Sequence, residues 1–200
     1  MLLGHIREWN FDVFQLQETT AYPLVAVAET ALNELNLTFS MDVHIMKLRR
    51  FLVDISDGYI LTNTYHNQLH AADVTQTIYH FLSSCRLSQV LGLNNLAILS
   101  LVIGAAIHDV GHPGVTGKYL IAVGDILAVQ YNDNSPLENM HLSTAFQLLA
   151  KPQNNFMEKF PKPLFREFRR MIIEMVLSTD NDRHFTLMEK VCICEHVLVL

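Results

Sequence analysis

Charge is scarce in this sequence, and positive charge most of all. Lys, Arg, Asp and Glu make up 17% of the 200 residues, against roughly 25% in an average globular domain, while half of the residues are apolar. This composition excludes an intrinsically disordered chain. The 14 Lys and Arg against 20 Asp and Glu give a net charge of −6. Because no basic run occurs, we expect no nucleic-acid partner.

Cysteine pairs and long apolar runs are also missing. The three cysteines form neither an even disulfide framework nor a C-x-x-C motif, which favours a reducing compartment. The longest apolar run, Leu96–Ile107, contains Ser100 and Gly104 and is too short to span a bilayer. The segment Met1–His5 lacks the charged start and the cleavage site of a signal peptide. We therefore expect a cytoplasmic protein without a transmembrane segment.

The apolar residues recur at the spacing of α-helices. Ile45, Leu48, Leu52 and Ile55 form one helical stripe, and Gly58 suits a helix end. The same period predicts helices over 23–36, 74–85, 95–108 and 164–176. Gly and Pro cluster at 111–117 and 152–163, which we interpret as loops. Since sustained strand alternation is hard to find, the sequence predicts a compact all-α fold of several helices around one core.

Two of the ten histidines lie close together in the chain. His66 and His70 are four residues apart and Asp73 follows three later, so a helix would place all three on one face. Such a pair could bind one metal ion, or divide metal binding and proton transfer between its imidazoles while Asp73 orients a ring. Taken alone, the spacing is more typical of ordinary surface or core histidines.

A second cluster, His108, Asp109 and His112, follows the apolar run. Buried charge is costly unless it is paired or bound to metal, and Gly111 and Pro113 break the helix so that the side chains face an opening. The adjacent His and Asp could bind one ion, and the second carboxylate oxygen could bridge to another. A helix-terminal His beside a stray Asp is the alternative interpretation.

Further acidic residues lie downstream. Glu138 opens another amphipathic helix, where the helix dipole favours a carboxylate, so a capping role is a serious alternative to a functional one. Asp180 and Asp182 follow one more helix and could be turn residues.

Five motifs occur in a fixed order: His66-Asn-x-x-His70-Ala-x-Asp73-Val74, His108-Asp109-x-x-His112-Pro-Gly, Tyr131-Asn-Asp, Leu137-Glu-Asn and Thr179-Asp180. In order and spacing they resemble the catalytic domain of the class I cyclic nucleotide phosphodiesterases. We therefore expect residues 1–190 to form part of such an all-helical, HD-type domain. The apolar residues 191–200 do not resemble the family's continuation, and we interpret them as a divergent tail.

The resemblance implies two divalent metal ions, zinc together with magnesium or manganese. His70, His108 and Asp109 match zinc ligands, and Asp109 also matches the bridge to the second ion. His66 matches the general acid that protonates the departing 3′ oxygen. The positions around the metal-bound waters are matched by His112, Glu138, Thr179 and Asp180.

The sequence departs from the family pattern at four places. Met140 stands where a His-His pair usually begins, Gly117 where an Asn is common, and Gly111 where the residue is often acidic. No residue matches the family's final third, which supplies an Asp ligand of zinc and the groups that grip the purine. The substrate-binding residues are therefore unidentified, and we expect a truncated domain with little or no activity alone.

The sequence thus predicts an enzyme of signal transduction that hydrolyses cAMP, cGMP or both to nucleoside 5′-monophosphates. The alternative is a truncated, catalytically impaired form that acts by associating with a full-length partner, as a homo- or heterodimer. A third possibility is another metal-dependent phosphohydrolase of the wider His-Asp group. It has less support, because the element from His66 to His70 is particular to the phosphodiesterases.

Overall fold

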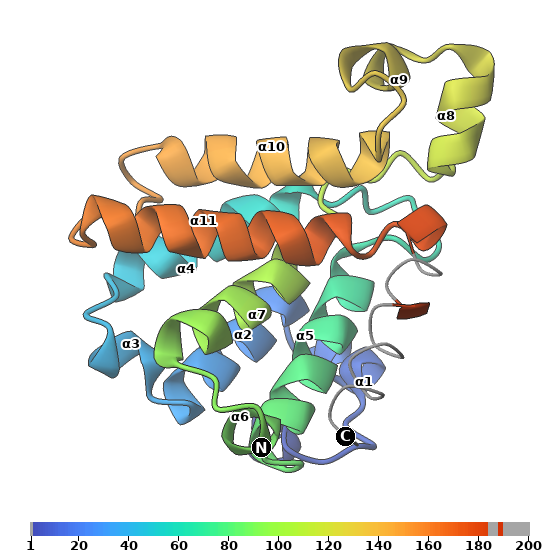
Figure 1. Ribbon diagram of the computed structural model, residues 1–200. Helices are drawn as coiled ribbons and strands as arrows, with labels where there is room; N and C mark the ends of the chain where they lie inside the picture. The colour runs from blue at the N-terminus through green and yellow to red at the C-terminus, as the bar shows by residue number, and fades with distance from the viewer. Residues whose placement is uncertain (1, 184–187, 190–200) are drawn as a thin grey trace.

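The protein consists of helices joined by short loops (Figure 1). The computed structural model describes residues 2–183 and 188–189, and no β-strand occurs among them, so the expected all-α fold is confirmed. The tail expected at 191–200 lies outside the described residues. The helices and 3-10 turns are η1 (Leu2–His5), α1 (Val13–Thr19), α2 (Pro23–Glu34), α3 (Leu37–Ser40), α4 (Ile45–Gly58), α5 (Gln68–Ser83), α6 (Leu87–Val90), α7 (Asn95–Ile107), α8 (Gly117–Val123), α9 (Ile126–Gln130), α10 (Pro136–Ala150), α11 (Lys162–Leu177) and η2 (Asn181–Arg183).

Side-chain caps explain where the two central helices begin. Asn67 Oδ1 accepts hydrogen bonds from the backbone N–H groups of Leu69 (2.9 Å) and His70 (3.3 Å), which fixes the start of α5. Asn94 Oδ1 accepts one from the N–H of Ala97 (2.8 Å) at the start of α7. A cap of this kind contributes about 1 kcal/mol, because it satisfies N–H groups that have no partner within the helix.

Helix α7 is the centre of the fold. It is apolar on nearly every side and packs against α2, α5 and α11. Leu99 and Val102 are fully buried, and burial of one such side chain stabilises the fold by roughly 1.5–3 kcal/mol. Neither α7 nor any other helix in the described residues is long and apolar enough to cross a membrane. The packing of α7 carries the residues that follow Ile107 into the interior of the molecule.

Helices α8 and α9 form a small arm beyond the beginning of α10 (Figure 1). Leu120 of α8, Ala128 of α9 and Leu137 of α10 are buried together in a cluster separate from the main core. Because α10 also packs against α4 and α11, the arm is anchored to the rest of the fold through α10.

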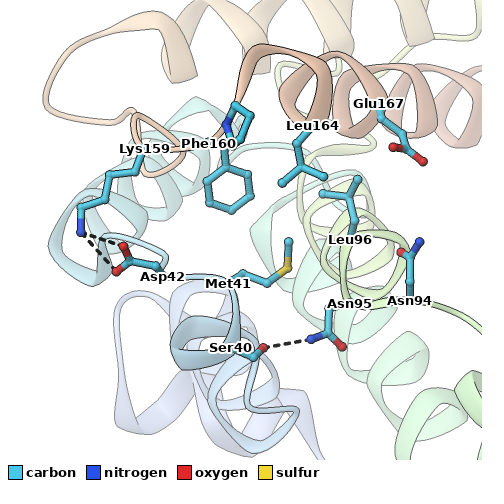
Figure 2. A pocket seen from close by; sticks show the side chains of 11 residues that line it. Ser40, Met41, Asp42, Asn94, Asn95, Leu96, Lys159, Phe160, Leu164 and Glu167 are labelled. Atoms are coloured by element: carbon cyan, nitrogen blue, oxygen red, sulfur yellow. Dashed lines mark hydrogen bonds and ion pairs between the residues drawn. The ribbon is translucent and has the colours of Figure 1, made fainter.

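A cavity of about 430 Å³ lies beside α3 and the N-terminal ends of α7 and α11 (Figure 2). Met41, Leu96 and Leu164 line its apolar part, and Lys159 and Asp42 form an ion pair of 2.9 Å beside it. Its lining contains neither histidine nor cysteine, so the imidazole-rich chemistry of the sequence lies elsewhere.

Candidate active site

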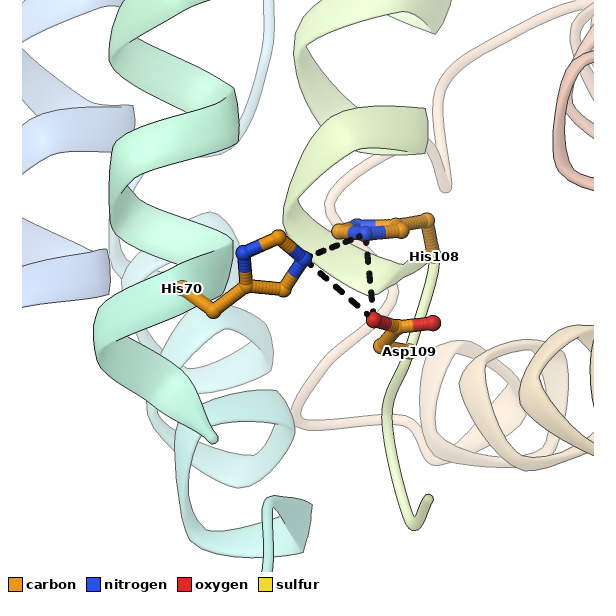
Figure 3. A group of neighbouring side chains, drawn as sticks. All are labelled: His70, His108 and Asp109. Atoms are coloured by element: carbon orange, nitrogen blue, oxygen red, sulfur yellow. Dashed lines mark hydrogen bonds and ion pairs between the residues drawn. The ribbon is translucent and has the colours of Figure 1, made fainter. Parts of the chain in front are cut away.

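Two helix ends bring three potential metal ligands together (Figure 3). His108 is the residue that caps the C-terminal end of α7 and Asp109 follows it, while His70 lies in the first turn of α5. The Nε2 atoms of His108 and His70 are 3.3 Å apart. Asp109 Oδ2 lies 3.3 Å from the Nε2 of His108 and 3.4 Å from the Nε2 of His70. These three side chains form a group that could hold a metal ion.

The orientation of His108 suits it to be a ligand. Its Nδ1 lies 2.8 Å from the carbonyl oxygen of Ala105, and a carbonyl can only accept, so Nδ1 carries the proton. In the neutral ring, Nε2 then presents a lone pair to His70 and Asp109. Two imidazole nitrogens and a carboxylate oxygen at such distances need a proton or a cation among them.

The charge state of the cluster follows from burial and from its own contacts. Burial would raise the pKa of the Asp109 carboxyl, but hydrogen bonds from His108 and His70 outweigh burial and hold that pKa far below its usual range. Burial would lower the pKa of His108, but the Asp109 carboxylate outweighs burial and raises it. Asp109 is therefore ionised at neutral pH, as a carboxylate ligand must be.

Tyr59 holds the backbone on both sides of these ligands. Its buried hydroxyl donates to the carbonyl oxygen of Ala106 (3.0 Å), and the N–H of Asp109 points to the same hydroxyl oxygen at 3.4 Å. Burial, followed by the Asp109 carboxylate, raises the pKa of the Tyr59 phenol well above its usual value, so the hydroxyl keeps its proton. No motif in the sequence pointed to this residue.

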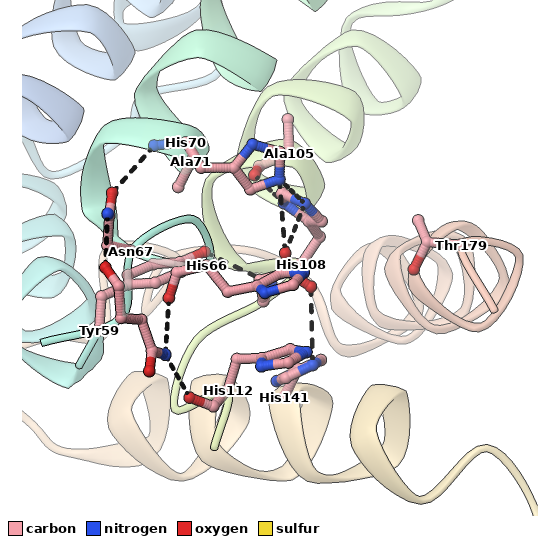
Figure 4. Close-up of polar contacts among 12 residues, drawn as sticks. Tyr59, His66, Asn67, His70, Ala71, Ala105, His108, His112, His141 and Thr179 are labelled. Carbon is pink, nitrogen blue, oxygen red and sulfur yellow. Dashed lines mark hydrogen bonds and ion pairs between the residues drawn. The ribbon is translucent and has the colours of Figure 1, made fainter. Parts of the chain in front are cut away.

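The imidazoles of His66 and His112 are stacked (Figure 4). Their ring centroids are 3.8 Å apart and their planes differ by 6°. His112 Nδ1 accepts a hydrogen bond from the N–H of Gly114 at 3.0 Å. Burial lowers the pKa of His112, and the neighbouring His66 lowers it further. The stack therefore pairs His66 with a neutral imidazole at neutral pH.

One expectation about the first motif is wrong. His66 precedes the N-cap Asn67 and so lies in the loop before α5, not on a helix face shared with His70. Asp73 is exposed on α5 and its carboxylate forms no hydrogen bond to any other described residue, so it orients neither imidazole. Because Asn67 caps the start of α5, the helix begins at Gln68, two residues after His66, and the expected i, i+4 geometry on one helix does not form.

His141 is a component of the site that motif analysis missed. It is 1% exposed, its Nδ1 lies 2.8 Å from the carbonyl oxygen of Val110, and its Nε2 lies 3.7 Å from Asp109 Oδ1. Burial lowers its pKa to about 4, so the ring is neutral at physiological pH. Two signals could have identified it: it directly follows Met140, where the family's His-His pair usually begins, and it lies three residues after Glu138 on the same face of a helix.

Three other expected residues lie around the cluster without joining it. Glu138 is in the first turn of α10, where burial, and then Asp180 among its neighbours, raises the pKa of its carboxyl. Thr179 Oγ1 donates to the carbonyl oxygen of Val176 (2.8 Å), and Figure 4 shows Thr179 apart from the imidazoles. Asp180 accepts a hydrogen bond from Ser135 Oγ at 2.7 Å.

A cavity of about 1240 Å³ opens over the cluster and has two kinds of wall. Its polar wall includes His66, Asp109, His112 and Glu138. Its apolar wall is formed by side chains from α5, α7 and α11: Val74, Ile78, Leu101 and Met175. Ligand sites combine apolar walls with a few convergent polar groups in this way, and an ion beside the polar wall would face a bound molecule.

Comparisons with known proteins agree with this geometry. A family model described as 3′5′-cyclic nucleotide phosphodiesterase matches residues 65–196. A probable 3′,5′-cyclic-AMP phosphodiesterase, pde-4 of Caenorhabditis elegans, is 36% identical over 93% of this chain and 27% of its own length. The dual specificity calcium/calmodulin-dependent 3′,5′-cyclic nucleotide phosphodiesterase 1B of Homo sapiens is 39% identical over 92% of this chain and 34% of its own.

A solved structure supports the same relationship. The crystal structure of the phosphodiesterase domain of Salpingoeca rosetta rhodopsin phosphodiesterase superposes with a TM-score of 0.76 at 31% identity. The match covers 84% of this chain and 50% of that one. The chain thus spans half of that solved chain and, at 27% and 34%, about a quarter to a third of the two curated relatives.

Proposed function

The chain belongs to the 3′,5′-cyclic nucleotide phosphodiesterase family, whose model matches more than half of it, and from this we propose that its larger cavity hydrolyses a cyclic nucleotide to a nucleoside 5′-monophosphate. The names of its relatives include cyclic-AMP and dual-specificity enzymes, so we propose cAMP, cGMP or both as substrates. The corresponding role is that of a cytoplasmic enzyme of signal transduction.

We propose that His70, His108 and Asp109 hold zinc, and the spacing of their ligand atoms is the observation that carries this proposal. Ligand atoms about 2.0–2.1 Å from a tetrahedral zinc ion are separated from one another by about 3.3–3.4 Å. The three separations here are 3.3, 3.3 and 3.4 Å. Three protein ligands leave one tetrahedral position open, which is typical of catalytic and not of structural zinc.

We propose a second divalent ion, magnesium or manganese, beside Asp109 Oδ1. Oδ2 faces the two histidines, whereas Oδ1 lies on the side of His141, so the carboxylate can serve both positions. Waters of this ion would be held by His112, Glu138, Thr179 and Asp180. Thr179 Oγ1 donates its proton to the carbonyl of Val176, and its lone pairs would accept a hydrogen bond from such a water.

Bound at these positions, divalent cations would polarise the phosphoryl oxygens and lower the pKa of water. Hydrolysis adds the elements of water across the bond between phosphorus and O3′, so that the departing O3′ needs a proton. We propose that His66, which lines the cavity, holds this proton and donates it to O3′. A well-placed acid contributes roughly 10²–10⁴ in rate.

A second candidate function is association with a full-length phosphodiesterase. The match to the solved domain covers 50% of that chain, and the wall formed by Val74, Ile78, Leu101 and Met175 faces an open cavity. Such a wall could contact a partner chain in a homo- or heterodimer. In this role the chain would bind zinc but would not turn over substrate.

Two measurements on the purified chain test these proposals together. Zinc content after dialysis is measured by mass spectrometry, and phosphorus NMR then follows cAMP and cGMP with added zinc and magnesium. Hydrolysis predicts bound zinc and a 5′-monophosphate product, both lost in His108→Ala. Zinc without product, beside an active full-length relative, favours association. A chain that binds no zinc contradicts the proposed metal centre.

A further inference from the structure

The imidazole of His66 needs a means of support that α5 does not provide. His66 belongs to the loop between α4 and α5, because the helix begins only after Asn67. A loop residue lacks the repeated i, i+4 hydrogen bonds that fix a helical one. Its stacking on His112 at 3.8 Å therefore depends on contacts between this loop and the loop that follows α7.

Asn63 supplies those contacts. Its Nδ2 donates to the carbonyl oxygen of His66 at 3.0 Å and to the carbonyl oxygen of His112 at 2.8 Å. Both N–H groups of one amide thus join the backbones of the two stacked residues, and the bond to His112 spans 49 positions of sequence from Asn63.

The backbone carbonyl and the side-chain Oδ1 of Asn63 also have close neighbours. Its own carbonyl oxygen accepts a hydrogen bond from Asn67 Nδ2 at 3.0 Å, which connects it to the cap of α5. On the other side, Gly114 adopts φ +81°, and a Cβ atom there would lie 3.0 Å from Asn63 Oδ1. The glycine thus leaves room for the amide beside His112.

We propose that Asn63 is a positioning residue, whose side-chain amide holds the imidazole of His66 against that of His112 over the cavity. This inference rests on the proposed function for its catalytic meaning, since His66 is the proposed proton donor. Its structural content stands on the two hydrogen bonds and the stack alone. A proton donor displaced by about 1 Å can cost on the order of 10²-fold in rate.

The test uses the full chain without metal, so that it does not depend on turnover. Asn63→Asp keeps the shape of the side chain but removes both donors and sets a carboxylate against two carbonyl oxygens. The ring C–H signals of His66, assigned by their loss in His66→Ala, are recorded by ¹H–¹³C NMR at one fixed pH. In the wild-type chain we expect the ring-current shift of a stacked imidazole, and in Asn63→Asp its loss.

Asn139→Asp is the matched control. Asn139 Nδ2 also donates to two backbone carbonyls, those of Asn134 (2.8 Å) and Ser135 (3.1 Å), but it joins neither of the stacked residues. We expect it to leave the His66 signals in place. Gly114→Ala disturbs the same amide from the opposite side and should reproduce the loss, which keeps the proposal testable if Asn63→Asp does not fold.

The outcomes separate this inference from the proposed function. Unchanged His66 signals in both Asn63→Asp and Gly114→Ala overturn the positioning role, whatever the chain catalyses. Loss of the stack in a chain that never hydrolyses cyclic nucleotides supports the positioning role and removes the catalytic one. Where turnover is measurable, Asn63→Asp should lower kcat with KM unchanged, and a fall in kcat without loss of the stack contradicts the inference.

Discussion

The thioether sulfur of Met140 lies 3.3 Å from the position that a Cβ atom on Gly111 would occupy. Both residues depart from the phosphodiesterase pattern, one at a position that is often acidic and the other at a position that is usually His. The contact places the two departures side by side, with a flexible thioether beside a glycine in the loop after α7.

We expect Gly111→Ala to destabilise the chain by about 1–2 kcal/mol. Gly111 has φ +78°, a conformation in which a Cβ atom is strained by the backbone itself. The thioether can move aside, so the added strain is mostly that of the backbone. Urea unfolding measures the change.

Met140→Ala in the same background identifies the source of that strain. If backbone strain causes the destabilisation by Gly111→Ala, the coupling free energy between the two substitutions is below about 0.5 kcal/mol. If Met140→Ala instead restores the lost stability in full, the destabilisation comes from the thioether contact. Gly4→Ala is the control, since nothing lies within 4 Å of a Cβ there and its φ is not positive.

Substitution of His70 and of His66 should show that one residue binds metal and the other donates a proton. We expect His70→Ala to weaken zinc binding by more than about 100-fold, because it removes one of three ligand atoms. His66→Ala should leave zinc content unchanged and abolish any turnover. Zinc content is read by mass spectrometry after dialysis, with His80→Ala as a control outside the cluster. Loss of zinc in His66→Ala would instead make His66 a ligand.

Asp109→Asn should lower the occupancy of both metal ions at once. The carboxylate faces His70 and His108 through one oxygen and His141 through the other, so one neutral amide replaces an anion in both positions. Parallel titrations with zinc and with manganese, the latter followed by its paramagnetic signal, measure the two occupancies. Retention of manganese while zinc is lost would refute the bridging assignment.

Acid sensitivity is expected from a carboxyl far from the site. The Tyr79 hydroxyl and then Arg7 hold the pKa of Glu34 below its usual value. A carboxyl whose pKa is depressed on folding stabilises the protein above its unfolded-state pKa of about 4.3, and that contribution is lost as pH falls through the folded-state pKa. The gap in Tm between wild type and Glu34→Gln should therefore be widest near neutral pH and close on acidification below about pH 4.3.

The control for this prediction is Glu174→Gln. Glu174 pairs with Arg170 on the exposed face of α11, and such pairs contribute little, so its Tm profile should follow that of the wild type. A gap for Glu34→Gln that is constant with pH would show that the lost contact is not ionic.

The helices could be read from the sequence because helical periodicity is local. The stripe from Ile45 to Ile55 and the stop at Gly58 correspond to α4 as it stands in the structure. The start of α5 was also within reach, since Asn before an apolar run is a capping signal. Giving weight to Asn67 would have kept His66 off the helix.

The residues that the sequence could not reveal act through distant contacts. Tyr59 bonds to a carbonyl 47 positions away, Asn63 to one 49 positions away, and His141 to one 31 positions away. In each case the partner is a backbone carbonyl, which every residue type possesses. No pattern of side chains therefore encodes the pairing, and only the packing of α4, α5 and α10 around the end of α7 creates it.

Because α7 lies at the centre of the fold, the two parts of the site are expected to differ in how readily they unfold locally. Amide hydrogens in the buried turns before His108 are expected to exchange with solvent only when the whole domain unfolds, whereas a surface loop such as 60–67 can open on its own. His108 and Asp109 follow directly after this protected helix. His66 lies in the loop that the side-chain amide of Asn63 joins to the loop after α7. Local opening could therefore withdraw the proton donor while the cation-binding end of α7 stays assembled.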